Sequence, residues 1–193
     1  MFPAALRKDA ERANVCPDDS PVAPGFNELK NRNMEKDPKR SPAQIVISKE
    51  EAVFWMDGQG RWHNQHGPFA HKKIINHFNA AIRKDQQGYF VAQNHGGIDE
   101  KVYFKHAETA LFATEVFWGN PVQMLLNTGE RMDLVPGLLF IRNDQLFHRK
   151  GDEIVKFSER ALQNIAMHMD FSENAYSIFM HGVRHIIPAD TDD

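Results

Sequence analysis

The chain has 193 residues, 41% of them hydrophobic and 25% charged, an ordinary composition for a globular protein of one or two small domains. Its formal net charge of −3, with histidine counted as neutral, gives no general attraction to nucleic acid or to an anionic membrane surface. No apolar run approaches the roughly 20 residues that cross a bilayer, and the first residues lack the apolar region of a secretory signal, so we expect a cytoplasmic protein.

Residues 1–42 are predicted to form a flexible N-terminal arm, because prolines are concentrated there and apolar residues show no periodicity. The single cysteine, Cys16, falls in this arm, so no internal disulfide can form. A mixed-charge stretch over residues 30–40 is typical of a solvated linker, and its alternative role is to dock onto a partner protein.

The first predicted structural unit is a hairpin followed by a helix. Apolar residues 53–56 lead into Asp57-Gly58-Gln59-Gly60, which predicts a tight turn, and residues 61–63 return antiparallel. An apolar stripe at helical spacing then predicts a helix over residues 70–84. We expect Trp62 in the core, and Trp55 and Trp118 there as well.

The rest of the chain alternates short strands with turns, and a second helix is predicted over residues 159–169 with Ser158 as its N-cap. Residues 189–193 form an acidic tail. Met167, Met169 and Met180 with Phe171 and Phe179 indicate either core or a sticky apolar edge that could support a homodimer. The predicted strands are 88–93, 100–104, 111–118, 122–127, 138–142, 145–148, 154–157, 176–180 and 183–187.

Strands joined by short turns favour antiparallel pairing, so we predict an α+β fold of curved, mostly antiparallel sheets with two main helices. Landmarks recur at a nearly constant offset: Trp62-His63 and Phe147-His148, Asp85 and Asp170, Tyr89 and Tyr176. This recurrence predicts two similar hairpin–helix–hairpin modules, over residues 43–127 with a connecting hairpin and over residues 128–188.

Several short motifs follow one another in a fixed order between Trp55 and Pro188. Together they resemble an uncharacterised bacterial family known only as a domain of unknown function. The resemblance implies an α+β fold built from repeated motifs and a ligand-binding or signalling role, and it supplies no catalytic residues. The motifs are Asp57-x-x-Gly60-Arg61-Trp62-His63, Gly67-Pro68, Asp85-x-x-Gly88-Tyr89, Glu100-Lys101-Val102, Leu126-Asn127-Thr128-Gly129 and Gly182-x-x-x-Ile186-Ile187-Pro188.

The candidate ligand-binding residues are Arg61, His63 and Lys101. On a strand Arg61 and His63 share one face while Trp62 takes the other, and Lys101 could meet an anionic ligand. The alternative for each is an ordinary surface side chain. The turn at residues 127–130 could offer backbone N–H groups to an anion, or could be only a turn.

A metal site is the alternative at the same hairpin. His63 and His66 have a ligand-like spacing and His71 follows, with Asp57 as the nearest carboxylate. No His-Glu-x-x-His or Cys-x-x-Cys motif supports it, and ordinary surface histidines are the simpler interpretation.

Three functional hypotheses follow. The first is a non-enzymatic ligand-binding or regulatory module, since no nucleophile motif, phosphate loop or dinucleotide fingerprint is present. The second is a metal-dependent hydrolase or metal-binding protein using His63 and His66. The third is a structural protein-interaction module whose arm orders on a partner. No particular cofactor is indicated, and the expected partner is a small anionic ligand or a protein.

Overall fold

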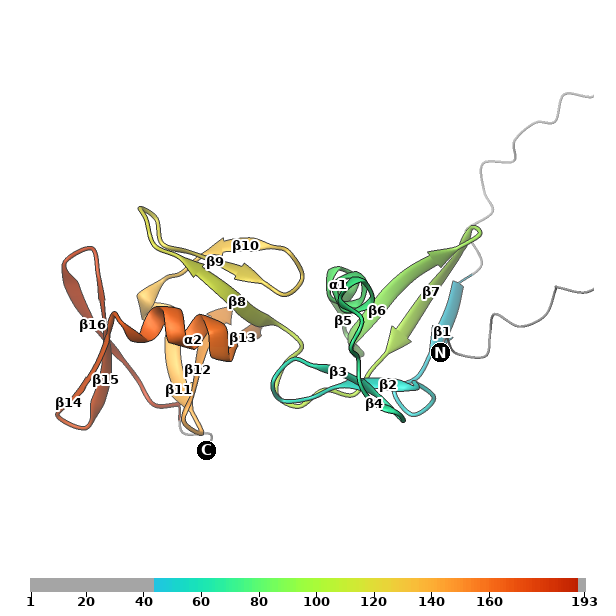
Figure 1. Cartoon of the computed structure of the whole chain (residues 1–193), viewed down its shortest axis with the longest axis horizontal. Coiled ribbons are helices and arrows are strands. Elements are labelled where there is room, and N and C mark those ends of the chain that lie inside the picture. The colour runs from blue at the N-terminus through green and yellow to red at the C-terminus, as the bar shows by residue number, and fades with distance from the viewer. Residues whose placement is uncertain (1–43, 191–193) are drawn as a thin grey trace, which may run out of the picture. The chain divides into compact units, whose positions relative to one another are not determined.

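The computed structural model describes residues 44–190; the predicted arm, Cys16 and residues 191–193 lie outside this range. Within it the chain forms many short strands, two α-helices and one 3₁₀ helix (Figure 1). The bounds are β1 Gln44–Ile47, β2 Phe54–Met56, β3 Trp62–Asn64, β4 Gly67–Pro68, α1 Lys72–Ala80, β5 Ile82–Asp85, β6 Gly88–His95, β7 Ile98–Tyr103, β8 Phe112–Phe117, β9 Gln123–Leu126, β10 Arg131–Asp133, η2 Pro136–Leu138, β11 Leu139–Arg142, β12 Gln145–Lys150, β13 Glu153–Phe157, α2 Glu159–Ala166, β14 Met169–Ser172, β15 Ala175–Met180 and β16 Val183–Ile187.

The strands form four sheets, and the predicted α+β class with curved, mostly antiparallel sheets and two main helices is confirmed. Their orders are β1-β7-β6-β5, β10-β9-β8-β13-β12-β11, β14-β15-β16 and β2-β3-β4. Among the pairings of named strands only β1 with β7 and β13 with β8 are parallel. The other pairings of named strands all join consecutive strands in antiparallel orientation, as the short turns predicted.

Helix α1 is shorter than predicted, because residues 82–85 form strand β5 instead of its last turn. Ile82 fits the helical apolar stripe, but it also pairs with Val91 of β6 and is only 4% exposed. The prediction was wrong here because one buried isoleucine satisfies both periodicities and the sheet pairing decides between them.

Helix α2 begins as predicted, with the Ser158 hydroxyl accepting a hydrogen bond from the Ala161 N–H at 3.3 Å. It ends at Ala166 rather than at Met169, because Met169 opens β14 and pairs with Ile178. The helix packs against β8 and β13 (Figure 1). Its cap was visible in the sequence, whereas the strand that shortens it was missed.

One continuous apolar core joins side chains from both halves of the described chain. In element order, three strands, a helix and three strands occur as β2–β3–β4–α1–β5–β6–β7 and again as β11–β12–β13–α2–β14–β15–β16. That is the order a duplicated module would produce, and the duplication itself remains a prediction.

Several large apolar side chains remain exposed near the C-terminal sheet. Met167 is 81% exposed, Phe171 57% and Phe179 48%, whereas Met180 is buried. Met167, Phe171 and Phe179 therefore fit the predicted apolar edge, whereas Met180 fits the core.

Among the described residues, no helix has the length and apolar character needed to cross a bilayer.

Gly60 in the β2–β3 turn packs tightly against Phe112 of β8. It has φ +78°, and a Cβ placed there would lie 2.9 Å from the Phe112 ring. Gly60→Ala should lower the free energy of unfolding by about 2–4 kcal/mol, the sum of an αL penalty and overpacking, measured by urea denaturation.

Gly129→Ala is the matched control for this variant. Gly129 has a similar φ of +88°, but nothing lies within 4 Å of the corresponding Cβ. Gly129→Ala should therefore lower the free energy of unfolding only by the cost of placing alanine in a left-handed backbone conformation, about 1–2 kcal/mol. Equal losses in the two variants would contradict a tight contact between the turn and Phe112.

Candidate functional site

The β2–β3 hairpin is organised around the carboxylate of Asp57. One oxygen, Oδ1, accepts hydrogen bonds from the backbone N–H groups of Gln59 and Arg61, both at 2.9 Å. An aspartate at the first position of a tight turn commonly closes it in this way. The turn is therefore fixed by the same side chain that reaches the candidate ligand-binding residues.

The other oxygen of Asp57, Oδ2, brings Arg61 and His63 together. Arg61 Nε lies 3.0 Å from it and His63 Nε2 lies 2.9 Å from it. Burial alone would raise the pKa of Asp57, but the hydrogen bonds from the Arg61 backbone, the His63 ring, the Gln59 backbone and the Arg61 side chain together lower it to about 2. Asp57 is thus a charged clamp on both residues.

The two tryptophans of this hairpin lie on different faces. Trp62 is 1% exposed and donates from Nε1 to Asn79 Oδ1 at 2.8 Å, so its predicted place in the core is confirmed. Trp55 is 40% exposed and its ring stacks on that of His63 at 5.7 Å between centroids. The prediction of a core Trp55 was wrong, because the alternation that buries Phe54 and Met56 turns Trp55 outward. Trp118 is half-buried against the core.

Lys101, the third candidate, pairs with a different carboxylate. Its Nζ lies 3.2 Å from Asp85 Oδ2, which also accepts a 2.7 Å hydrogen bond from the Tyr103 hydroxyl. The Lys101 amino group also lies 4.7 Å from the centroid of the Phe90 ring. The Tyr103 hydrogen bond is the main reason why the pKa of Asp85 is lowered. The structure therefore brings Arg61 and His63 onto one carboxylate and Lys101 onto another.

The three histidines of the metal alternative make separate contacts. The ring of His63 bonds to Asp57, and that of His66 lies 3.1 Å from Gln65 Nε2. His71 precedes α1 at the N-cap position without a side-chain cap hydrogen bond. Within residues 44–190, no three His, Cys, Asp or Glu side chains gather in an arrangement that could hold a metal ion.

Three backbone N–H groups of the turn at residues 127–130 donate to acceptors within the protein. The Asn127 N–H donates to Phe112 O, the Gly129 N–H to Leu126 O, and the Glu130 N–H to Thr128 Oγ1. These N–H groups are therefore already bonded where an anion would need them.

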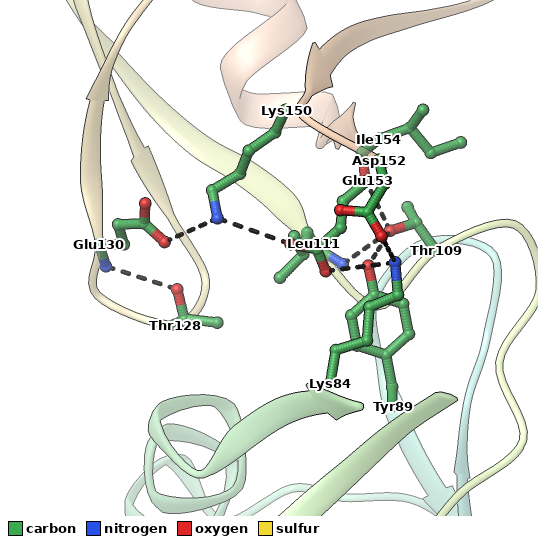
Figure 2. A network of polar contacts seen from close by, with 10 residues as sticks. All are labelled: Lys84, Tyr89, Thr109, Leu111, Thr128, Glu130, Lys150, Asp152, Glu153 and Ile154. Atoms are coloured by element: carbon green, nitrogen blue, oxygen red, sulfur yellow. Dashed lines mark hydrogen bonds and ion pairs between the residues drawn. The ribbon is translucent and has the colours of Figure 1, made fainter. Parts of the chain in front are cut away.

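A chain of alternating charges links β5 to the β12–β13 hairpin and to the β9–β10 turn (Figure 2). Lys84 Nζ lies 3.1 Å from Asp152 and 4.0 Å from Glu153. Lys150 Nζ lies 3.6 Å from Glu153 and 3.3 Å from Glu130. Glu153 thus stands between two lysines that come from different sheets.

Beneath these charges lies a buried hydroxyl pair, Tyr89 and Thr109 (Figure 2). Their oxygens are 3.5 Å apart, and Thr109 also donates to Ile154 O at 2.7 Å. The pKa of Tyr89 is raised, mainly by burial and further by the neighbouring carboxylates of Glu153 and Asp152, although the hydrogen bond with Thr109 opposes this. The phenol therefore stays protonated and serves as a structural donor.

Sequence reasoning misses this network because the helical pattern extends over Lys84 and because its partner Asp152 is 68 residues away. The available sequence signal is the acidic pair Asp152-Glu153 shortly after Lys150, which marks charge but not a partner.

Comparison with solved structures finds proteins that this chain resembles in fold. A crystal structure of a DUF1285 family protein from Silicibacter pomeroyi DSS-3 matches with a TM-score of 0.51 at 10% identity, covering 76% of this chain and 83% of that one. The fold is similar to that of DUF1285 proteins. A second DUF1285 protein, from Shewanella baltica OS155, matches at 12% identity with a TM-score of 0.43, covering 63% of this chain and 96% of that one.

The resemblance to a bacterial domain of unknown function is thereby confirmed, and it extends to the fold. No protein-family model matches the sequence, and no curated protein matches it either. The DUF1285 likeness supplies no activity, so function has to be argued from the side chains of the site itself.

Proposed function

We propose that this protein is a non-enzymatic ligand-binding module of a regulatory or signalling kind, and that it binds a small anionic ligand on the outer face of the β2–β3 hairpin. The observation that supports the proposal is the clamp of Asp57 on Arg61 and His63. It holds a cation and an imidazole side by side, on a hairpin whose opposite face is anchored in the core by Trp62.

The Arg61 guanidinium is arranged for recognition of an anion. Its Nε is used by Asp57, and within residues 44–190 its terminal amino groups have no protein acceptor. The side chain is 64% exposed, so those groups are accessible. A planar guanidinium held from one edge presents its other edge to carboxylate or phosphate oxygens in a bidentate geometry.

Trp55 adds a flat apolar surface beside this cation. Its ring is exposed and lies nearly parallel to the His63 ring, with 12° between the planes. An indole and an imidazole fixed in this way favour an anion that carries a ring or another flat group. The proposed ligand class is therefore a small anion with a planar part.

Lys101 enters the proposal as a second cation for a ligand that extends beyond the hairpin. Its charge is matched by Asp85, and the Tyr103 hydroxyl on the same carboxylate leaves Asp85 bonded if the lysine turns away. Lys101 is therefore expected to contribute less to ligand binding than Arg61, and a separate variant, Lys101→Gln, tests its contribution.

The test is a thermal-shift screen of the full chain against ATP, AMP, citrate and inorganic phosphate, followed by titration of any compound that responds. A compound at 100 times its dissociation constant should stabilise the protein by about 2.7 kcal/mol, a shift of several degrees. Arg61→Gln should then weaken binding by roughly tenfold, because one charge-assisted contact is lost. Lys101→Gln, measured in the same way, reports whether the ligand reaches the second carboxylate.

Arg160→Gln provides the matched control. Arg160 is also an exposed arginine paired with a single carboxylate, at 2.8 Å from Glu115, but it lies on α2. Arg160→Gln should leave the affinity for the responding compound unchanged. Equal affinity in wild type and Arg61→Gln would refute the proposed placement, and turnover of a substrate at enzyme-like rates would refute the non-enzymatic reading.

We also propose that the two β–β–β–α–β–β–β series arose by duplication of one module. The equal order of elements supports it, as does the burial of both Trp62 and Phe147 at matching positions. A cytoplasmic location and a homodimer through the exposed residues Phe171 and Phe179 complete the proposal.

A further inference from the structure

A row of side chains crosses the outer face of the small sheet β2-β3-β4 and continues beyond that sheet to Lys105. Trp55 of β2 lies opposite His63 of β3, and His63 lies opposite Pro68 of β4. On its other side Trp55 forms a parallel bridge with Lys105, and the Met56 N–H donates to Lys105 O at 2.8 Å. Residues that lie opposite each other in a sheet point to the same face. Lys105 therefore shares the face on which the ligand is proposed to bind.

The charge of Lys105 is available to a ligand. Its side chain is exposed, and within residues 44–190 it makes no ion pair or side-chain hydrogen bond. Lys101 differs, because its amino group lies 3.2 Å from the carboxylate of Asp85. On the outer face of the hairpin, the charges of Arg61, Lys105 and Asp57 sum to a net positive charge, which a single small anion would not exceed.

Trp55 lies between the two cations. Lys105 is one strand away from Trp55 on one side, and Arg61 leads into β3 on the other side, where its carbonyl accepts a hydrogen bond from the Asp57 N–H at 3.0 Å. Because neighbouring strands are about 4.8 Å apart, the backbones of Arg61 and Lys105 are separated by about 10 Å across the strands. Both side chains are long enough to reach a ligand that lies on the indole.

The three side chains differ in what each can recognise. The exposed indole of Trp55, nearly parallel to the His63 ring, offers a flat surface to a planar group. The guanidinium of Arg61 favours a carboxylate or phosphate in bidentate geometry. The ammonium of Lys105 is a flexible point charge, so it can pair with a second anionic group without a fixed angle.

We propose that Lys105 is the second cation of the ligand site, and that the ligand is a planar dianion. Its ring lies on Trp55, and its two anionic groups meet Arg61 and Lys105. This inference rests on the proposed function, because it places the ligand on the same face of the β2–β3 hairpin. It narrows the ligand class from planar anions in general to those that are negative at both ends.

The test compares terephthalate with benzoate, which has the same ring and one carboxylate fewer. Dissociation constants for the full chain are measured by titration followed by NMR. Wild type should bind terephthalate roughly tenfold tighter than benzoate, because a second charge-assisted contact forms. Lys105→Gln should make the two affinities equal and leave that for benzoate unchanged. Lys105→Glu should reverse the preference, because the introduced negative charge repels the second carboxylate.

Lys73→Gln is the matched control for the lysine variants. Lys73 is also an exposed lysine, but it lies on α1. That helix packs on the buried face of the hairpin, where the rings of Phe78 and Trp62 are 5.3 Å apart. Lys73→Gln should therefore keep the preference of wild type for terephthalate.

Equal affinity of wild type for terephthalate and benzoate would overturn the inference, as would an undiminished preference in Lys105→Gln. Arg61→Gln separates this failure from failure of the proposed function, because it should weaken binding of both compounds. If it does so while Lys105→Gln changes nothing, the second cation is refuted and the site on the hairpin stands. If Arg61→Gln binds both compounds as tightly as wild type, or if wild type binds neither, the site itself is refuted and the inference with it.

Discussion

Trp62→Ala is expected to lower the free energy of unfolding by about 3–5 kcal/mol, a large part of the stability of a domain of this size. Trp62 is 1% exposed and its ring packs edge-to-face on Phe104 at 4.7 Å and on Phe78 at 5.3 Å. Removing the indole leaves a cavity where β3 meets α1 and the strand–loop boundary after β7. Urea denaturation followed by far-UV circular dichroism measures the loss.

Trp62→Phe separates the cavity from the hydrogen bond. It keeps most of the aromatic volume but removes the Nε1 donor to Asn79 Oδ1. Its loss should be about 1–3 kcal/mol, smaller than that of the alanine variant. A loss below about 1 kcal/mol for Trp62→Ala would contradict the central place of this side chain in the core.

His148 is expected to make the protein lose stability between pH 6.5 and pH 4. It is fully buried, and burial lowers its pKa to about 4, although a backbone hydrogen bond at Arg149 opposes this. The unfolded chain therefore takes up a proton near pH 6.5, whereas the folded chain takes it up only near pH 4. The stability present above pH 6.5 is lost as the pH falls through this window, by an amount on the order of 3 kcal/mol.

The effect is measured as the difference between wild type and His148→Gln in the free energy of unfolding from pH 4 to pH 7.5. Glutamine can still accept the hydrogen bond that His148 Nε2 takes from the Val135 N–H at 3.2 Å, and it does not titrate. The difference should shrink or reverse as the pH falls. His77→Gln, at an exposed position of α1, is the control; a constant difference for His148→Gln across the range would contradict the prediction.

Local pattern was enough to predict most of the hairpins, the α+β class and the Ser158 cap, because each depends on residues close in sequence. It was not enough for β5 and β14, where a strand partner outweighs helical periodicity. Trp55 shows a related limit: its outward direction follows from the alternation of a strand of only three residues.

In the candidate site, too, some contacts could be predicted from the local sequence and others could not. Arg61 and His63 meet through Asp57, which is four and six residues away, so their proximity could be predicted from the hairpin. The pairs of Lys101 with Asp85 and of Arg142 with Asp190 join residues on different strands or from distant parts of the chain. Such pairs depend on the complete topology, and no local pattern indicates them.

The parallel pairing of β8 with β13 also bears on the order in which the chain folds. Lys156 pairs with Phe112, which precedes it by 44 residues, while the other pairings of this sheet join neighbouring strands. The β8–β9–β10 and β11–β12–β13 hairpins can therefore form locally, and the seam between them closes last, against the entropy of a long loop. Pairing of this kind slows folding toward the range of milliseconds to seconds. Within the largest sheet, the centre is thus completed after its two edges.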